Sequence, residues 1–278
     1  MAKEPYPALI AEDFELTTWM AIGASIYAVM VWVLPFWISV PLPILFLVTR
    51  TIKTVLMSKG ILSPPSSDTL PGRYTAKIPG PYGRGQGGVV CFILGARINH
   101  PMGRAAPGIY EVDKMYRSAW REAAGNRDKY GYLGKSSMLV ASEEKGGITF
   151  LWLTYWKTLE GLRDFAAGDS HRTVQMQWLA KQYPYLGIMH ETYHSPSGSW
   201  ENIYHDFQPF GLGSTKYAVE TDPSTKEGGV ETDEKGRPLS TPLISAKGRS
   251  MRSMFARMGR YEDINVAKWN PEQGLFDE

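Results

Sequence analysis

The stretch ITFLWLTYWKTLEGLRDFAAGDSHRTVQMQWLAKQYPYLGIMHETYH, residues 148–194, decides the fold that the sequence predicts. Residues 148–155 alternate between two sets of bulky or β-branched side chains, which is typical of a mostly buried strand. The spacing of apolar residues then becomes helical, and Gly168 is expected to end this helix in a left-handed conformation. A second helix follows and stops at Pro184, after which residues 187–194 alternate again as a strand.

Three predicted elements precede this stretch. Residues 88–98 have the pattern of a strand, residues 110–124 that of an amphipathic helix, and residues 137–142 that of a short strand. The order is therefore β-α-β-β-α-β, which is the ferredoxin-like arrangement of an α+β fold. Helices cover one face of such a sheet and leave the other open. We expect the open face to be buried against a second copy of the chain, which makes a homodimer.

The N-terminal part of the chain has a very different composition. Residues 16–49 contain no charged side chain, and a transmembrane helix needs about 20 apolar residues. We interpret residues 1–59 as a membrane anchor, with 16–34 as a spanning helix and 41–57 as a second short pass or an interfacial segment. A buried helix of a soluble protein is the alternative. A cleaved signal peptide fits poorly, because the residues before the apolar run are acidic.

Basic residues follow the apolar run, at Arg50, Lys53 and Lys59. If one helix spans the membrane, the positive-inside rule places everything after it in the cytosol, and we expect the membrane to be the endoplasmic reticulum. Two spans would return the N-terminus to that side without moving the main domain. The net charge of +2 does not suggest nucleic acid as a partner.

The rest of the chain divides by composition. Residues 60–87 are rich in proline and glycine and are predicted to be a linker, residues 88–213 the catalytic domain, and residues 214–278 a polar tail. Within the tail, methionines recur at helical spacing beside arginines in residues 249–260. This basic amphipathic segment is expected either to lie on an anionic membrane surface or to dock on the domain. Cys91 is the single cysteine, so no intrachain disulfide can form.

The motif HETYH, residues 190–194, matches the H-E-x-x-H pattern of zinc peptidases. That pattern works on a helix, because one helical turn brings both histidines onto one metal ion. Here the alternation and the flanking prolines predict a strand, on which His190 and His194 lie about 13 Å apart. We therefore expect no metal site, and a zinc hydrolase remains only as an alternative.

Aromatic and polar side chains from adjoining elements are expected to form one ligand cavity around His190. Aromatic walls with a few polar groups typically bind small apolar ligands. A histidine can transfer protons near neutral pH, and an arginine can stabilise an oxyanion. The alternative for each aromatic is a place in the core, and for His190 a place in the core or an interface. The side chains expected around His190 are Trp152, Tyr155, Trp156, His171, Arg172, Trp178, Tyr193 and Tyr204.

The same residues resemble a known family. FLWLTYWKTLEGLRDFA at 150–166, SHR at 170–172 and GIMHETY at 187–193 are similar to the fungal fumagillin-pathway-type monooxygenase-like family. The resemblance implies an N-terminal hydrophobic anchor and a dimeric α/β barrel similar to the antibiotic-biosynthesis monooxygenases. It also implies tailoring oxidation of a polyketide or terpenoid in secondary metabolism. No cofactor is expected, because in related small monooxygenases an electron-rich substrate anion reacts with O₂ directly.

Carried onto this sequence, the resemblance implies specific site residues. The polar candidates are His171, Arg172, His190 and Glu191, and the pocket candidates are Trp152, Trp178 and Tyr193. We expect a hydrophobic small-molecule substrate, with His190 as the proton-transfer base and Arg172 stabilising the substrate anion. The alternatives are a cyclase or isomerase on the same scaffold, and a non-catalytic membrane protein that scaffolds other enzymes.

Overall fold

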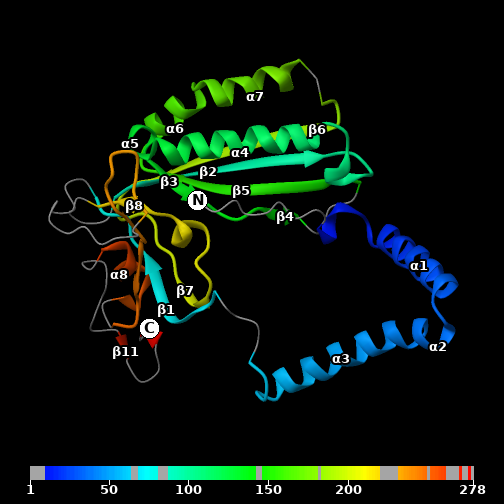
Figure 1. Cartoon of the computed structure of the whole chain (residues 1–278). Coiled ribbons are helices and arrows are strands. Elements are labelled where there is room, and N and C mark those ends of the chain that lie inside the picture. The colour runs from blue at the N-terminus through cyan, green and yellow to red at the C-terminus, as the bar shows by residue number, and fades with distance from the viewer. Residues whose placement is uncertain are drawn as a thin grey trace.

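The structure is a computed structural model, and it describes residues 10–63, 68–80, 87–141, 146–180, 183–219, 231–248, 251–260, 269–270 and 275–276. Its central domain is a five-stranded sheet with helices packed on one face (Figure 1). The strands are β2 (Val89–Ile98), β3 (Tyr132–Lys135), β4 (Leu139–Ala141), β5 (Ile148–Trp156) and β6 (Leu186–Ser195). The helices are α4 (Ile109–Gly125), α5 (Arg127–Tyr130), α6 (Leu159–Ala166) and α7 (Asp169–Leu179).

The strand order is β3-β5-β2-β6, with β4 also paired to β5, and every pair is antiparallel. α4 connects β2 to β3, while α6 and α7 connect β5 to β6. This is the ferredoxin-like arrangement that the sequence predicts. Strand β3 is not predicted from the sequence, because it has only four residues and contains Gly134, whose φ is 153°.

The register of the three long strands decides which residues face the helices. Leu94 pairs with Trp152 on one side and with His190 on the other, so these three side chains form one row on one face of the sheet. The even-numbered residues of β2, β5 and β6 share that face, since side chains alternate along a strand. Its core members include Ile98 and Phe150, which pack against α4.

The helices between β5 and β6 begin and end with specific contacts. The side chain of Thr158 caps α6 by accepting a hydrogen bond from the N–H of Gly161 at 3.1 Å. The prediction that Gly168 is left-handed is wrong, because it is not among the described glycines with positive φ. Its N–H instead donates to the carbonyl of Phe165 at 2.9 Å, which closes the last turn of α6.

Two apolar helices precede the domain. α1 (Leu16–Val33) leads away from it, α2 (Phe36–Ser39) reverses the chain, and α3 (Pro41–Ser58) leads back (Figure 1). The helical segments Leu16–Val33 and Phe36–Ser58 are long and apolar enough to cross a membrane, and neither is buried in the protein. The apolar run is therefore two helices rather than one.

A second, smaller sheet lies beside the domain. Its central strand β1 (Leu70–Ala76) lies within the predicted linker, so the described part of that linker is not wholly irregular. β1 pairs with β7 (Tyr204–Phe207) and with β10 (Leu243–Ser245). The remaining short elements are η1 (Ala11–Asp13), η3 (Gly103–Ala105), η4 (Gly211–Ser214), β8 (Tyr217–Ala218), β9 (Leu239–Ser240), α8 (Met254–Met258), β11 (Trp269–Asn270) and β12 (Leu275–Phe276).

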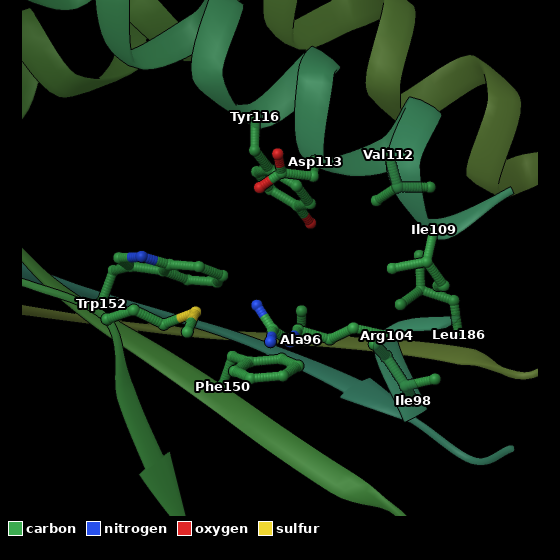
Figure 2. A pocket seen from close by; sticks show the side chains of 11 residues that line it. Ala96, Ile98, Arg104, Ile109, Val112, Asp113, Tyr116, Phe150, Trp152 and Leu186 are labelled. Carbon is green, nitrogen blue, oxygen red and sulfur yellow. The ribbon is translucent and has the colours of Figure 1, made fainter. Parts of the chain in front are cut away.

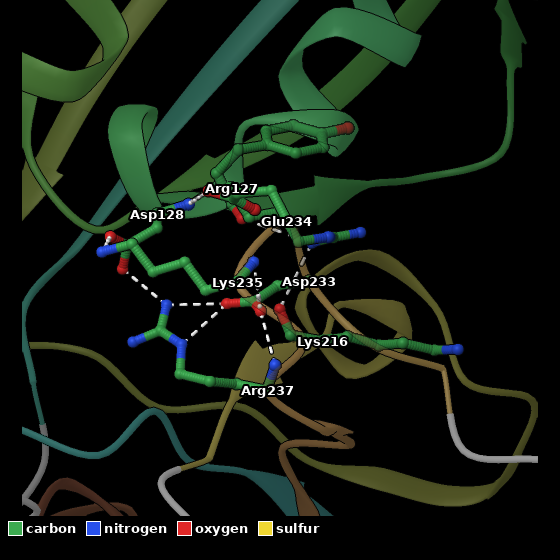
Figure 3. A network of polar contacts seen from close by, with 8 residues as sticks. Arg127, Asp128, Lys216, Asp233, Glu234, Lys235 and Arg237 are labelled. Atoms are coloured by element: carbon green, nitrogen blue, oxygen red, sulfur yellow. Dashed lines mark hydrogen bonds and ion pairs between the residues drawn. The ribbon is translucent and has the colours of Figure 1, made fainter.

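The described part of the C-terminal segment is docked on the domain. Arg237 contacts both Asp128 and Asp233, and Lys235 also contacts Asp128, which ties this segment to α5 (Figure 3). In α8 the buried Arg257 donates from Nε to the carboxylate of Glu201 at 2.6 Å. Docking on the domain is thus the alternative that the structure shows for the basic amphipathic segment.

Candidate functional site

A cavity of about 40 Å³, open to solvent, lies between the first half of α4 and the helix-covered face of the sheet (Figure 2). Strands β2, β5 and β6 supply its floor, since Ile98, Phe150 and Leu186 pack together at this end of the sheet. A cavity with such walls is suited to an apolar ligand. The main apolar lining residues are Ile98, Ile109, Val112, Phe150, Trp152 and Leu186.

Tyr116 supplies a polar group inside these walls. Its ring stacks on Trp152 with the ring centroids 5.9 Å apart and an interplanar angle of 24°. Its hydroxyl points into the cavity, and no hydrogen-bond partner for it occurs within the described part of the chain (Figure 2). Burial raises the pKa of Tyr116 to about 12. The hydroxyl is therefore protonated at neutral pH and can donate a hydrogen bond to a ligand oxygen.

Asp113 lies one helical turn before Tyr116 and also lines the cavity. One oxygen of its carboxylate accepts a hydrogen bond from Nε of Arg117 at 2.5 Å. This pair is partly exposed, and the contact with Arg117 fixes the position of the carboxylate. Asp113 is thus a carboxylate within reach of a ligand in the cavity, and it can accept a proton.

Arg104 lies at the other end of the cavity and is paired with Asp13, which precedes α1. Its Nε and Nη2 donate to the two oxygens of Asp13, each at 2.7 Å. Burial by itself raises the pKa of the Asp13 carboxyl, but the hydrogen bonds from Arg104 and from the N–H of Ile10 outweigh burial and leave that pKa below its ordinary value. The pair is therefore ionised over the whole neutral range.

The predicted aromatic residues fall in different places. Trp152 lines the cavity, as expected. Trp156 is on the same face of the sheet but is 0% exposed, and its indole N–H donates to Oγ1 of Thr154. It therefore belongs to the core. The side chain of Trp178 lies outside the described residues.

The predicted tyrosines do not reach the cavity. Tyr155 is on the opposite face of the sheet, where it pairs with Cys91, and burial raises the pKa of its hydroxyl. The hydroxyl of Tyr204 donates to the carbonyl of Phe210 and accepts from the N–H of Gly213, both at 2.9 Å, so it holds the chain around η4. Tyr193 is exposed on the face away from the helices.

The predicted polar residues are divided between the two faces. His190 is exposed on the helix side, where its ring lies 5.4 Å from that of Phe92. Glu191 lies on the opposite face and accepts a hydrogen bond from the hydroxyl of Tyr193 at 2.5 Å. Arg172 is exposed on α7. The structure therefore separates Glu191 from His190, as the alternation of a strand requires.

His171 approaches His190 from α7. Burial lowers the pKa of His171, a backbone contact with Ala166 opposes this, and the nearby His190 lowers it further. Its Nδ1 atom is buried and has no hydrogen-bond partner in the described structure. His190 lies in the same row of the sheet as Trp152, and Leu94 lies between them. The two histidines therefore lie beside the cavity, about 10 Å along the sheet from its aromatic wall.

The HETYH segment is extended, because it lies within β6. The metal-binding geometry of a helix is therefore absent from it, as the sequence analysis expects. In the described ranges, no group of three or more His, Cys, Asp or Glu side chains is placed to hold a metal ion.

Three polar residues of the cavity were not among the predicted site residues. Tyr116 lies on the face of the predicted helix that includes Val112 and Trp120, so its inward direction was visible in the periodicity. Asp113 follows Val112 directly and gave no separate signal. Arg104 lies in a short segment between elements, and its partner Asp13 is 91 residues away.

Comparison with known proteins shows similarity to a monooxygenase family. Residues 89–212, from the start of β2 to η4, match the family model described as Monooxygenase af470-like. The protein Monooxygenase af470 of Aspergillus fumigatus is 28% identical over 257 residues, which cover 90% of each chain. The chain is similar to the Monooxygenase af470-like family over this segment. These similarities support an enzyme of the monooxygenase kind, and they confirm the family resemblance seen in the sequence.

Solved structures give much weaker similarities. An aldoxime dehydratase is 13% identical with a TM-score of 0.35, and the match covers 54% of this chain and 44% of that one. SnoaB, a cofactor-independent oxygenase from Streptomyces nogalater, is 14% identical with a TM-score of 0.26, over 38% of this chain and 90% of that one. These scores are too low to support any functional conclusion, so the assignment of the fold depends on the strand order described above.

Proposed function

We propose that this chain is a membrane-attached monooxygenase that oxidises a hydrophobic small molecule in the cavity between α4 and the sheet. One observation carries the proposal: an apolar cavity with a stacked Tyr116–Trp152 wall and an available Tyr116 hydroxyl lies inside the segment that matches a monooxygenase family. The apolar walls favour a substrate of the polyketide or terpenoid class, and tailoring of a secondary metabolite is the corresponding role.

The oxidation that needs the fewest components is one in which the substrate itself reduces O₂. If an activated CH₂ group becomes a carbonyl, one oxygen atom stays on that carbon and the other leaves as water with the two hydrogens. The substrate then supplies all four electrons, so neither a metal nor an organic cofactor is required. The reaction begins with removal of a proton from carbon, which gives an electron-rich anion that reacts with O₂.

The cavity offers groups for both parts of this step. Tyr116 donates a hydrogen bond to the substrate oxygen on which the negative charge develops, which stabilises the anion. Asp113, three residues before Tyr116, is a carboxylate that lines the cavity, and it is the first candidate for the base. The pair His171 and His190 is the second candidate base, because the lowered pKa of His171 keeps its imidazole neutral at pH 7. Arg172 retains its proposed role in binding the anion only if α7 moves toward the cavity.

A homodimer would complete the domain. On the sheet face away from the helices, one end around Tyr155 contacts η4, while Ile93, Leu151 and Leu153 are only partly buried. Met189 on the edge strand β6 is 42% exposed. A second copy of the chain would bury these side chains, as the apolar face of a sheet requires. The basic residues Arg50 and Lys53 near the end of α3 favour a cytosolic domain on the endoplasmic reticulum.

Removal of the gene from its native producer tests the proposal. The metabolites of the deletion strain and the parent are compared by high-accuracy mass spectrometry. We expect an accumulated intermediate that differs from the normal product by one oxygen atom, with or without loss of two hydrogens. An isomer of unchanged mass would instead indicate a cyclase or isomerase, and an unchanged metabolite profile would indicate a non-catalytic scaffold.

A further inference from the structure

A buried ion pair joins the segment that precedes the apolar helices to the domain that follows them. Asp13 precedes α1, and Arg104 belongs to η3 of the domain, which follows α3. The side chains of Arg104 and Asp13 are only 4% and 1% exposed. Gly103 allows the close approach: its φ is 49°, and a Cβ there would lie 2.5 Å from the carbonyl oxygen of Asp13.

The segment before α1 is also packed against the domain by apolar contacts. Ile10 packs on the cluster that contains Ile98 and Ile109, both of which line the cavity. The indole N–H of Trp19 in α1 donates to the carbonyl of Ala11 at 2.7 Å, which ties the start of α1 to this segment. The beginning of α1 is therefore fixed at the cavity end of the domain.

This contact determines the path of the chain through a membrane. We propose that α1 and α2–α3 form a helical hairpin that enters and leaves the membrane on the side of the domain, so that the cavity end of the domain lies at the membrane surface. This inference rests on the membrane attachment included in the proposed function. A single span would put Asp13 and Arg104 on opposite sides of a hydrocarbon layer about 30 Å thick, which the ion pair forbids.

The lengths and charges of the helices fit a hairpin. α1 and α3 have 18 residues each, and each is about 27 Å long. Arg50 and Lys53 lie in the last part of the returning helix, where long basic side chains can extend to the membrane surface. The bend, at Phe36 and Trp37, is apolar and aromatic, which suits the opposite interface.

The hairpin also determines which end of the cavity lies next to the membrane. Arg104 lines the cavity and contacts Asp13, and α1 begins three residues later at Leu16. A hydrophobic substrate dissolved in the membrane would then meet the cavity at its surface, without passing through water. The ion pair forms the rim between the membrane and the cavity.

Cysteine labelling of the full-length chain tests the hairpin. Cys91 is the only native cysteine, so a Cys91→Ser background carries one reporter at a time. Glu12→Cys reports the segment before α1, Phe36→Cys the bend, and Ser118→Cys the exposed face of α4 on the domain. Sealed microsomes are treated with a membrane-impermeant maleimide, before and after detergent.

The hairpin predicts labelling of Glu12→Cys and Ser118→Cys in sealed microsomes, and of Phe36→Cys only after detergent. Protection of Glu12→Cys together with labelling of Phe36→Cys would show a single span and overturn the inference. Labelling of all three, or release of the chain by alkaline carbonate, would show that the helices do not enter the membrane and would also overturn it. A failed topology together with an accumulated intermediate that differs from the normal product by one oxygen atom in the deletion strain would leave the proposed oxidation intact. The expected topology together with an unchanged metabolite profile in the deletion strain would overturn only the oxidation.

Discussion

The ring of Tyr116 on α4 stacks on that of Trp152 on β5 with the ring centroids 5.9 Å apart, and this contact forms one wall of the apolar cavity. The stack holds the tyrosine side chain in place without a hydrogen bond from any described residue to its hydroxyl. Such a group is fixed in position and available to a ligand. The proposed activity therefore depends on a contact between α4 and β5, which places the hydroxyl of Tyr116.

Substitution Tyr116→Phe should lower turnover by about 10- to 100-fold, because it removes a hydrogen bond to the developing anion and leaves the stack in place. The hydroxyl has no described protein partner, so the melting temperature should change little. Product formation in the complemented deletion strain measures the effect. Tyr110→Phe is the matched control on the same helix, since Tyr110 is 70% exposed. Equal loss of product in both variants would contradict the role of Tyr116.

The identity of the base can be decided with two variants. Asp113→Asn should abolish most turnover if the cavity carboxylate removes the proton, and His190→Ala should then retain it. The opposite result would assign the base to the histidine pair that the sequence analysis favours. Product formation is measured for both variants, together with their circular dichroism spectra, which should match that of the parent.

The pH profile tests the histidine hypothesis. Burial and the nearby His190 place the pKa of His171 below its ordinary value, so a His171 base would lose its activity at a more acidic pH than a free imidazole would. Tyr116 has a pKa of about 12 and contributes no change below pH 10. The measurement is the rate of product formation in membranes between pH 5 and pH 9.

The ion pair between Asp13 and Arg104 should be important for stability. Asp13→Asn removes the carboxylate that neutralises a buried guanidinium, and we expect a loss of about 3–5 kcal/mol in the free energy of unfolding. Glu12→Gln, at the exposed neighbour, should have no measurable effect. Thermal unfolding of the detergent-solubilised chain compares the two. A small loss for Asp13→Asn would show that the N-terminal segment is only loosely attached.

The same pair predicts an acid transition. The folded-state pKa of Asp13 is below its ordinary value, so its stabilising contribution is complete above about pH 4 and is lost as the pH falls through the folded pKa. The stability difference between the parent and Asp13→Asn should therefore shrink below pH 4. A difference that stays constant down to pH 2 would contradict the ion pair.

The open face of the sheet should hold the dimer together. Leu151→Arg places a charge on the face that would meet the second copy, and we expect it to convert dimer to monomer. Light scattering after gel filtration in detergent gives the mass of the complex. Tyr110→Arg, on the exposed side of α4, is the control and should leave the dimer intact. A parent chain that is already monomeric would contradict the proposed assembly.

The central sheet could be predicted because its long strands and its main helix carry strong periodic patterns. The predicted helix at 110–124 differs from α4 by one residue at each end, and β2 and β5 lie where alternation indicates. β1 could not be found, because Pro71 and Gly72 at its bulged end look like a linker in isolation. Its strand pairing comes from segments more than a hundred residues away.

The site was less predictable, because a residue can lie in the right element and still point to the wrong place. Tyr155 lies three residues after Trp152 on β5. Because side chains alternate along a strand, this odd spacing places Tyr155 on the opposite face of the sheet. Trp156 is on the correct face but lies at the closed end of the layer, where α6 packs on it. The contact of Arg104 with Asp13 has no local pattern, since it depends on the folded path of the whole N-terminal segment.

The most direct test of the account is isotopic. The intermediate that accumulates in the deletion strain is incubated under ¹⁸O₂ with membranes that contain the full-length chain, and the product is analysed by mass spectrometry. We predict a product that carries one ¹⁸O atom and whose formation falls in the Tyr116→Phe variant. A product without the label, or an isomer of the intermediate, would contradict monooxygenation in this cavity.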